Sequence, residues 1–162
     1  MSNQHTKFAI VHVETTADEE IDCLSALVYD ATDGWLKAFY EARIQRHEIE
    51  AVRQAETISL TAAMTGLRQV CQDSILVAFE VAAVKRFVEK ACQETGVPYP
   101  FSIANEVDLK PMLNRQLGQV GEGAAGLREA ARQLGIRTLP SGQAPSWGAV
   151  AGWYILKRLV GV

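Results

Sequence analysis

The order of its apolar segments is the feature that most constrains what this chain can fold into. Residues 7–13, KFAIVHV, form a short β-rich run that suits a strand buried on both faces. Two further apolar segments follow over 21–29 and 35–40, joined by a turn in which Asp33 and Gly34 are expected to take positive φ angles. Three antiparallel strands are therefore predicted to open the chain.

Helix and strand alternate in the rest of the sequence. The spacing of apolar residues predicts a helix over 59–72, a strand over 74–78 and a helix over 81–95 that ends at Gly96. We also expect a short edge strand over 101–104 and helices over 108–117, 126–134 and 146–159. This order predicts one domain over 1–162 with an α/β fold: a mixed sheet with three leading antiparallel strands, then parallel strands, flanked by helices.

Charge and cysteine content narrow the function classes. The formal net charge of -3 provides no overall basic field, so nucleic-acid binding would have to depend on a local groove. Cys23, Cys71 and Cys92 are far apart and form no CxxC pair, which argues against a disulfide framework or a zinc site. No apolar run approaches the roughly 20 residues of a membrane span. We therefore expect a cytoplasmic protein with no membrane partner.

Several motifs resemble those of one enzyme superfamily. Residues 8–16, FAIVHVETT, are similar to the first motif of the DEDD (DnaQ-like) 3′-to-5′ exonucleases, an apolar strand ending in Asp-x-Glu-Thr-Thr, with His12 at the first Asp. Residues 75–87 resemble the second motif, with Val84 at its aspartate, and residues 144–151 stand at the third, with Pro145 at its histidine and Val150 at its aspartate. Residues 47–49, 106–113 and 126–136 resemble scaffold segments in the same order.

The resemblance implies a ribonuclease H-like fold, as in the proofreading domain of the DNA polymerase III epsilon subunit, but not the activity. In that family four carboxylates hold two divalent metal ions and a histidine deprotonates water. Glu14 is the one matched carboxylate, Val84 and Val150 cannot ligate a metal, and Pro145 has no proton acceptor. We therefore expect no catalytic residues and no cofactor.

An alternative is an active exonuclease with displaced ligands. His12, Glu14 and Glu80 could compose a rebuilt single-metal site, because imidazole and carboxylates can bind manganese, and magnesium would be the other candidate. The interpretation we favour is that Glu80 is an acid in the first turn of a helix, where it stabilises the helix dipole, and that His12 is a strand-end residue with a local hydrogen bond.

A vacated groove could still bind the 3′ end of a single-stranded nucleic acid. The hydroxyls of Thr15 and Thr16 could donate hydrogen bonds, Phe79 could stack on a base, and Lys85 and Arg86 could contact phosphates. Adjacent charges on a helix are, however, more often ordinary solvated residues.

The alternative to nucleic-acid binding is a protein-interaction module. Its partner could be another protein or a second copy of the chain, which would form a homo-oligomer. Trp147 and Trp153 are spaced near two helical turns and could form an exposed binding stripe, although core packing is the more common use of such a pair. The sequence thus predicts a catalytically degenerate exonuclease-like domain that acts by binding a nucleic-acid end or a protein partner.

Overall fold

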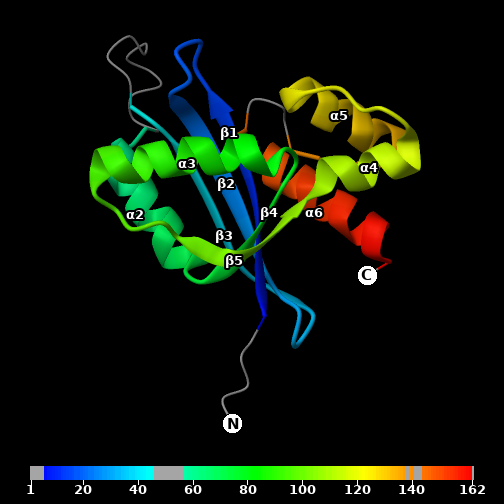
Figure 1. The fold of residues 1–162 in the computed structure, drawn as a ribbon, viewed down its shortest axis with the longest axis horizontal. Coiled ribbons are helices and arrows are strands. Elements are labelled where there is room, and N and C mark those ends of the chain that lie inside the picture. The colour runs from blue at the N-terminus through cyan, green and yellow to red at the C-terminus, as the bar shows by residue number, and fades with distance from the viewer. Residues whose placement is uncertain (1–5, 46–56, 138, 141–143, 162) are drawn as a thin grey trace.

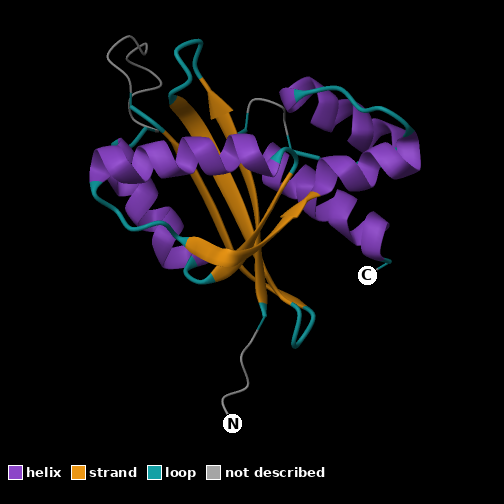
Figure 2. Ribbon diagram, in the orientation of Figure 1, coloured by secondary structure: helices purple, strands orange, loops and turns teal. Residues whose placement is uncertain are grey.

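The chain forms one five-stranded sheet with helices on both of its faces (Figure 1, Figure 2). The computed structural model describes residues 6–45, 57–137, 139–140 and 144–161. The strands are β1 (Lys7–Thr15), β2 (Ile21–Asp30), β3 (Trp35–Arg43), β4 (Ser74–Ala78) and β5 (Phe101–Asp108). The helices are α2 (Leu60–Cys71), α3 (Val81–Thr95), α4 (Leu109–Leu117), α5 (Gly123–Gln133) and α6 (Trp147–Val160).

The sheet is mixed, as the sequence predicts. Its strand order is β3-β2-β1-β4-β5. The first three strands pair antiparallel, whereas β4 pairs parallel with both β1 and β5. This arrangement confirms the predicted ribonuclease H-like α/β fold. Residues 47–49, which resemble a family element, lie outside the described residues.

Two apolar cores lie on opposite faces of the sheet. Ala9 and Val11 of β1 point toward α2 and α3, whereas Ile10 points toward α4, α5 and α6. Burial on both sides explains why β1 is apolar without alternation. The alternation of side chains then continues past the core, so that His12 and Glu14 lie on the same face as Ile10, beneath the start of α6.

Several details differ from those predicted: β1 and β3 run on to Thr15 and Arg43, and the other differences lie at β5, at α5 and in the β2–β3 turn. Strand β5 continues to Asp108, because residues 106–108 pair with β4, and Asp108 then caps α4 by accepting a hydrogen bond from the Lys110 backbone N–H at 3.1 Å. Helix α5 begins at Gly123 rather than at residue 126. In the β2–β3 turn only Gly34 has a positive φ, of 77°, because the Gly34 N–H bonds back to the Asp30 carbonyl in a longer loop.

Among the described residues, no helix combines the length and the apolar character that crossing a bilayer requires.

Candidate functional site

A cleft of about 420 Å³ opens at the carboxyl ends of β1 and β4. Its walls come from the end of β1, the start of β2, the junction of β4 with α3, and the first turn of α5. Ligand sites of open α/β sheets lie at such strand ends. The lining residues are Val11, His12, Val13, Glu14, Thr15, Asp22, Phe79, Glu80, Ala83, Val84, Phe87, Gly123 and Ala124.

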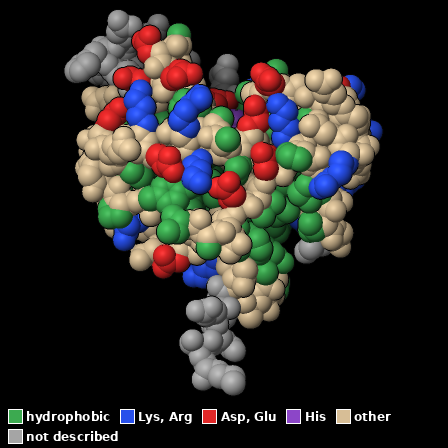
Figure 3. All heavy atoms as spheres, viewed as in Figure 1, with side chains coloured by type: hydrophobic (Ala, Val, Ile, Leu, Met, Phe, Trp, Pro, Cys, Tyr) green, Lys and Arg blue, Asp and Glu red, His purple; other side chains and the backbone are tan. Residues whose placement is uncertain are grey.

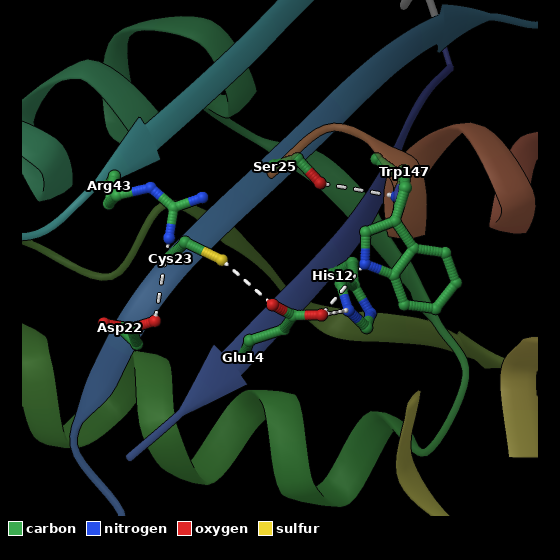
Figure 4. Close-up of polar contacts among 8 residues, drawn as sticks. His12, Glu14, Asp22, Cys23, Ser25, Arg43 and Trp147 are labelled. Carbon is green, nitrogen blue, oxygen red and sulfur yellow. Dashed lines mark hydrogen bonds and ion pairs between the residues drawn. The ribbon is translucent and has the colours of Figure 1, made fainter. Parts of the chain in front are cut away.

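Glu14 is the centre of a polar cluster at the inner wall of this cleft (Figure 4). The indole N–H of Trp147 donates a hydrogen bond to Glu14 Oε1 at 2.9 Å, and His12 Nε2 lies 3.5 Å from the same oxygen. The other oxygen, Oε2, accepts from the Cys23 thiol at 3.3 Å. Cys23 is there because β2 pairs it directly with Glu14. Groups from β1, β2 and α6 thus surround one carboxylate.

These contacts fix the protonation of both Glu14 and Cys23. The hydrogen bond with His12, followed by those from Trp147 and Cys23, lowers the pKa of Glu14 from 4.5 to about 2, against the opposing effect of burial. Burial, and then the negative charge of Glu14, raise the pKa of the Cys23 thiol to about 12. At neutral pH the carboxylate is ionised and the thiol is neutral, so Cys23 is a hydrogen-bond donor and not a nucleophile.

The first turn of α6 packs directly onto the first-motif residues. The Trp147 side chain is 1% exposed and meets the His12 ring edge-on, with ring centroids 4.9 Å apart. A Cβ atom on Gly148 would lie 2.0 Å from His12 Cγ, so only glycine permits this approach. The Ala149 backbone N–H donates to Ser25 Oγ at 3.3 Å. Core packing is therefore the correct interpretation of Trp147.

The other family motif positions offer no ligand atom. Val84 is buried in the core between the sheet and α3, at the wall of the cleft. Pro145 and Val150 are half-buried, and Val150 packs on the apolar core beneath α6. Glu14, the remaining matched carboxylate, already uses both of its oxygens. These residues do not fit the metal pair that the family resemblance implies.

Glu80 serves the fold in a way that neither sequence interpretation foresaw. Its backbone is left-handed, with φ 73°, at the N-cap of α3, and its side chain makes no cap hydrogen bond there. Instead, Glu80 Oε1 accepts from the Gly123 backbone N–H at 2.6 Å, and Oε2 lies 3.6 Å from Lys110 Nζ. The carboxylate therefore links the start of α3 to α4 and α5.

The predicted ligand set of His12, Glu14 and Glu80 is not assembled as a cluster. Within the described ranges, no group of three or more His, Cys, Asp and Glu side chains is placed to hold a metal ion. His12 and Glu14 contact each other, but the Glu80 carboxylate is engaged with Gly123 and Lys110.

Of the residues proposed to contact a nucleic acid, Thr15 and Phe79 line the cleft, whereas Thr16, Lys85 and Arg86 do not. The Thr16 hydroxyl accepts a hydrogen bond from the Glu20 N–H in the turn after β1. Phe79 is 8% exposed, which leaves little ring surface for stacking. Lys85 pairs with Glu106 and Arg86 with Glu19, each at 3.4 Å.

The cleft is not lined by basic side chains. Its lining includes the carboxylates of Glu14, Asp22 and Glu80 but no lysine or arginine. On the face shown in Figure 3, acidic and basic side chains are interspersed and form no basic stripe. A phosphate strand therefore has no electropositive groove to follow among the lining residues.

Four residues of the site were not singled out as such from the sequence: Cys23, Ser25, Trp147 and Gly148. The first two could have been found only from the β1–β2 register, which the sequence does not fix. The last two lie inside the segment that resembles the third motif, which was the available signal.

This is the fold of the DEDD-family 3′ exonucleases, as comparison with solved structures shows. No protein-family model and no curated protein matches the chain. The cell-death related nuclease 4 (CRN-4) superposes with a TM-score of 0.73 and 10% identity over 97% of this chain and 64% of its own length. The chain thus spans less than two thirds of that protein.

Two further structures show the same likeness. The nuclease domain of 3′hExo, a DEDDh family member bound to rAMP, matches with a TM-score of 0.61 and 10% identity, over 99% of this chain and 92% of that domain. Exonuclease I in its apo form matches with a TM-score of 0.69 and 13% identity, over 97% of this chain and 42% of that one.

Proposed function

We propose that this chain is a non-catalytic binding domain built on the 3′-to-5′ exonuclease fold, and that its cleft binds a protein segment carrying a positive side chain. The observation that carries the first part is the state of Glu14. Both of its oxygens are hydrogen-bonded within the chain, by Trp147 and Cys23, with His12 beside them. We therefore interpret Glu14 as a structural hydrogen-bond acceptor rather than a metal ligand.

Hydrolysis by two metal ions needs several free carboxylates and a proton acceptor. Val84 and Val150 stand where the resemblance requires aspartates, and Pro145 stands where it requires a histidine. The loss of a general base alone lowers rates by roughly 10² to 10⁴. Without ligands for either metal, we expect no hydrolysis of a phosphodiester.

The chemistry of the cleft supports a protein ligand over a nucleic-acid end. Its acidic residues, Glu14, Asp22 and Glu80, would repel a phosphate strand, even though Arg43 and Lys110 approach two of them from outside the lining. The apolar side chains of the lining are Phe79, Val84 and Phe87. Glu14 and Glu80 are already engaged within the chain, so an arginine or lysine of the ligand would pair with Asp22, whose side chain is 38% exposed. An apolar residue next to it would pack on the apolar part of the lining.

The first test is a nuclease assay on labelled single-stranded DNA and RNA with magnesium or manganese. We expect the wild type and Glu14→Gln to leave both substrates intact. Shortening that requires metal, stops with EDTA and is lost in Glu14→Gln would contradict the proposal. That result would instead support an active exonuclease that uses His12, Glu14 and Glu80.

Two adjacent alanines of α3, of which one lines the cleft, provide a matched test of binding. Ala83 lines the cleft, whereas Ala82 is exposed outside it, so Ala83→Arg and Ala82→Arg form a matched pair. The probe is a short capped peptide with one arginine between two apolar residues. Its binding is monitored by NMR, through the shift of the indole N–H resonance of Trp147. We expect Ala83→Arg to abolish binding and Ala82→Arg to preserve it. A labelled oligonucleotide that binds more tightly to Ala83→Arg, with no peptide binding to the wild type, would favour the nucleic-acid alternative.

A further inference from the structure

Strand β3 is the outer strand of the sheet, so the peptide groups on one of its sides face away from the other strands. Among the described residues that follow β3, Ile58 covers this side at the far end, where its N–H donates to the Arg43 carbonyl at 2.9 Å. Among the described residues, no strand pairs with the outer side of residues 35–42. An open edge of this length is a template for another strand.

Large exposed apolar side chains gather on this same strand. Trp35 is 70% exposed, Leu36 45% and Phe39 48%. Phe39 pairs with Leu27 of β2, whose side chain belongs to the core beneath α6, so Phe39 lies on that face of the sheet. Helix α6 contacts β1 and β2, which leaves Phe39 at the open border of the face. An apolar strip along a free edge is typical of an interaction surface.

The charges on β3 are arranged symmetrically about Phe39. Lys37 lies two residues before it and Glu41 two residues after it. In an antiparallel pair, residues at equal distances from a central pair lie opposite each other on one face. If Phe39 lies opposite Phe39 of a second copy, Lys37 comes near Glu41 of that copy, and the two-fold axis repeats this contact. Lys37 itself lies in the β-bulge of the β2–β3 pair and has no partner on β2.

The backbone direction of β3 is also suitable. The Arg43 carbonyl points outward to Ile58, whereas the Ile44 N–H bonds inward to Asp22. Because peptide directions alternate along a strand, Glu41 and Phe39 also present their N–H and C=O groups outward. Phe39 can therefore exchange two backbone hydrogen bonds with Phe39 of a second copy. We propose that two copies of this chain dimerise through β3, centred on Phe39, to form one continuous antiparallel sheet.

A second copy fits this edge better than a foreign strand. The opposite charges face each other only when β3 pairs antiparallel with an identical strand. An unrelated peptide has no reason to carry the same arrangement of charges. Lys37 contacts Asp33 across the exposed β2–β3 turn, whereas Glu41 takes part in no ion pair within the described residues. The competing interpretation is that Lys37, together with the β-bulge in the β2–β3 pair, protects the edge from pairing.

Sedimentation equilibrium over a range of protein concentrations tests the proposal. We expect the wild type to form dimers. Lys37→Glu and Glu41→Lys each replace two attractive contacts with two repulsive ones, so each should raise the dissociation constant roughly tenfold or more. An equimolar mixture of these two variants should form a heterodimer, because every opposed pair in it is attractive again.

The control is Lys90→Glu on α3, which makes the same change of charge on an exposed residue away from β3 and should not alter dimerisation. Thermal unfolding confirms that each variant is folded. A wild type that stays monomeric at every concentration would overturn the proposal and favour the protected edge. A dimer with the same dissociation constant in the wild type and both β3 variants would overturn it too. Because the cleft lies outside this surface, neither result depends on what the cleft binds.

Discussion

Replacement of Glu14 by glutamine should remove most of the electrostatic stabilisation at the start of α6. The drop in the pKa of Glu14 from 4.5 to about 2 corresponds to about 3.4 kcal/mol at about 1.36 kcal/mol per pKa unit. The Glu14 side chain is 31% exposed, and solvent screening reduces that value. We therefore expect Glu14→Gln to lower the free energy of unfolding by about 1.5 to 2 kcal/mol at neutral pH.

The pH dependence of this loss identifies its cause. A carboxyl group with a lowered pKa in the folded state stabilises the fold fully above its unfolded pKa of 4.5, and this contribution disappears as the pH falls toward about 2. Urea unfolding followed by circular dichroism should show a large difference between wild type and Glu14→Gln near neutral pH. The difference should shrink steadily below about pH 4.5.

A matched control is Glu94→Gln. Glu94 is 49% exposed and lies 4.0 Å from Lys90, so its removal should not change stability measurably at any pH. A stability difference that stays constant from neutral pH to about pH 2.5 would show that the charge of Glu14 does not stabilise the fold. A glutamine variant as stable as the wild type at neutral pH would show the same.

Three other experiments test the same cluster. Trp147→Phe keeps an aromatic ring but removes the donor to Glu14 and part of a buried side chain, so it should cost about 2 to 4 kcal/mol in urea unfolding and move the pKa of Glu14 upward in a carboxyl NMR titration. Gly148→Ala places a Cβ 2.0 Å from His12 Cγ and should cost about 1 to 3 kcal/mol, measured in the same way. With its pKa raised to about 12, the Cys23 thiol should react with a disulfide reagent near neutral pH only as fast as the chain unfolds.

Much of the fold was predictable because it depends on local patterns. The apolar run at β1 and the helical spacing of α2 and α3 specify element type without knowledge of their neighbours. The missed boundaries depend on tertiary contacts instead. Residues 106–108 extend β5 because β4 lies beside them, and α5 starts early where its Gly123 N–H bonds to Glu80. Neither partner can be read from the residues themselves.

The candidate site was predictable only in part, for the same reason. His12 and Glu14 were found because the resemblance to a motif places them next to each other at the end of a strand. Their partners come from elsewhere in the sequence: Cys23 through strand register, and Trp147 through the packing of a helix 133 residues away. A tryptophan in a terminal helix is typical of core packing, and the sequence carries no sign that its N–H group would bind a carboxylate.

The cluster around Glu14 connects the proposed absence of catalysis with the stability of the fold. A metal ligand must keep an oxygen lone pair free and accept the electrostatic cost of other carboxylates nearby. In this chain valines stand at positions 84 and 150 and bring no charge near Glu14, while the Trp147 N–H occupies one lone pair of a Glu14 oxygen. The hydrogen bonds of Glu14 therefore stabilise the fold without any metal ion. Restoring aspartates at the valine positions would not by itself recreate a metal site, because Trp147 and Gly148 would still hold α6 against His12 and Glu14.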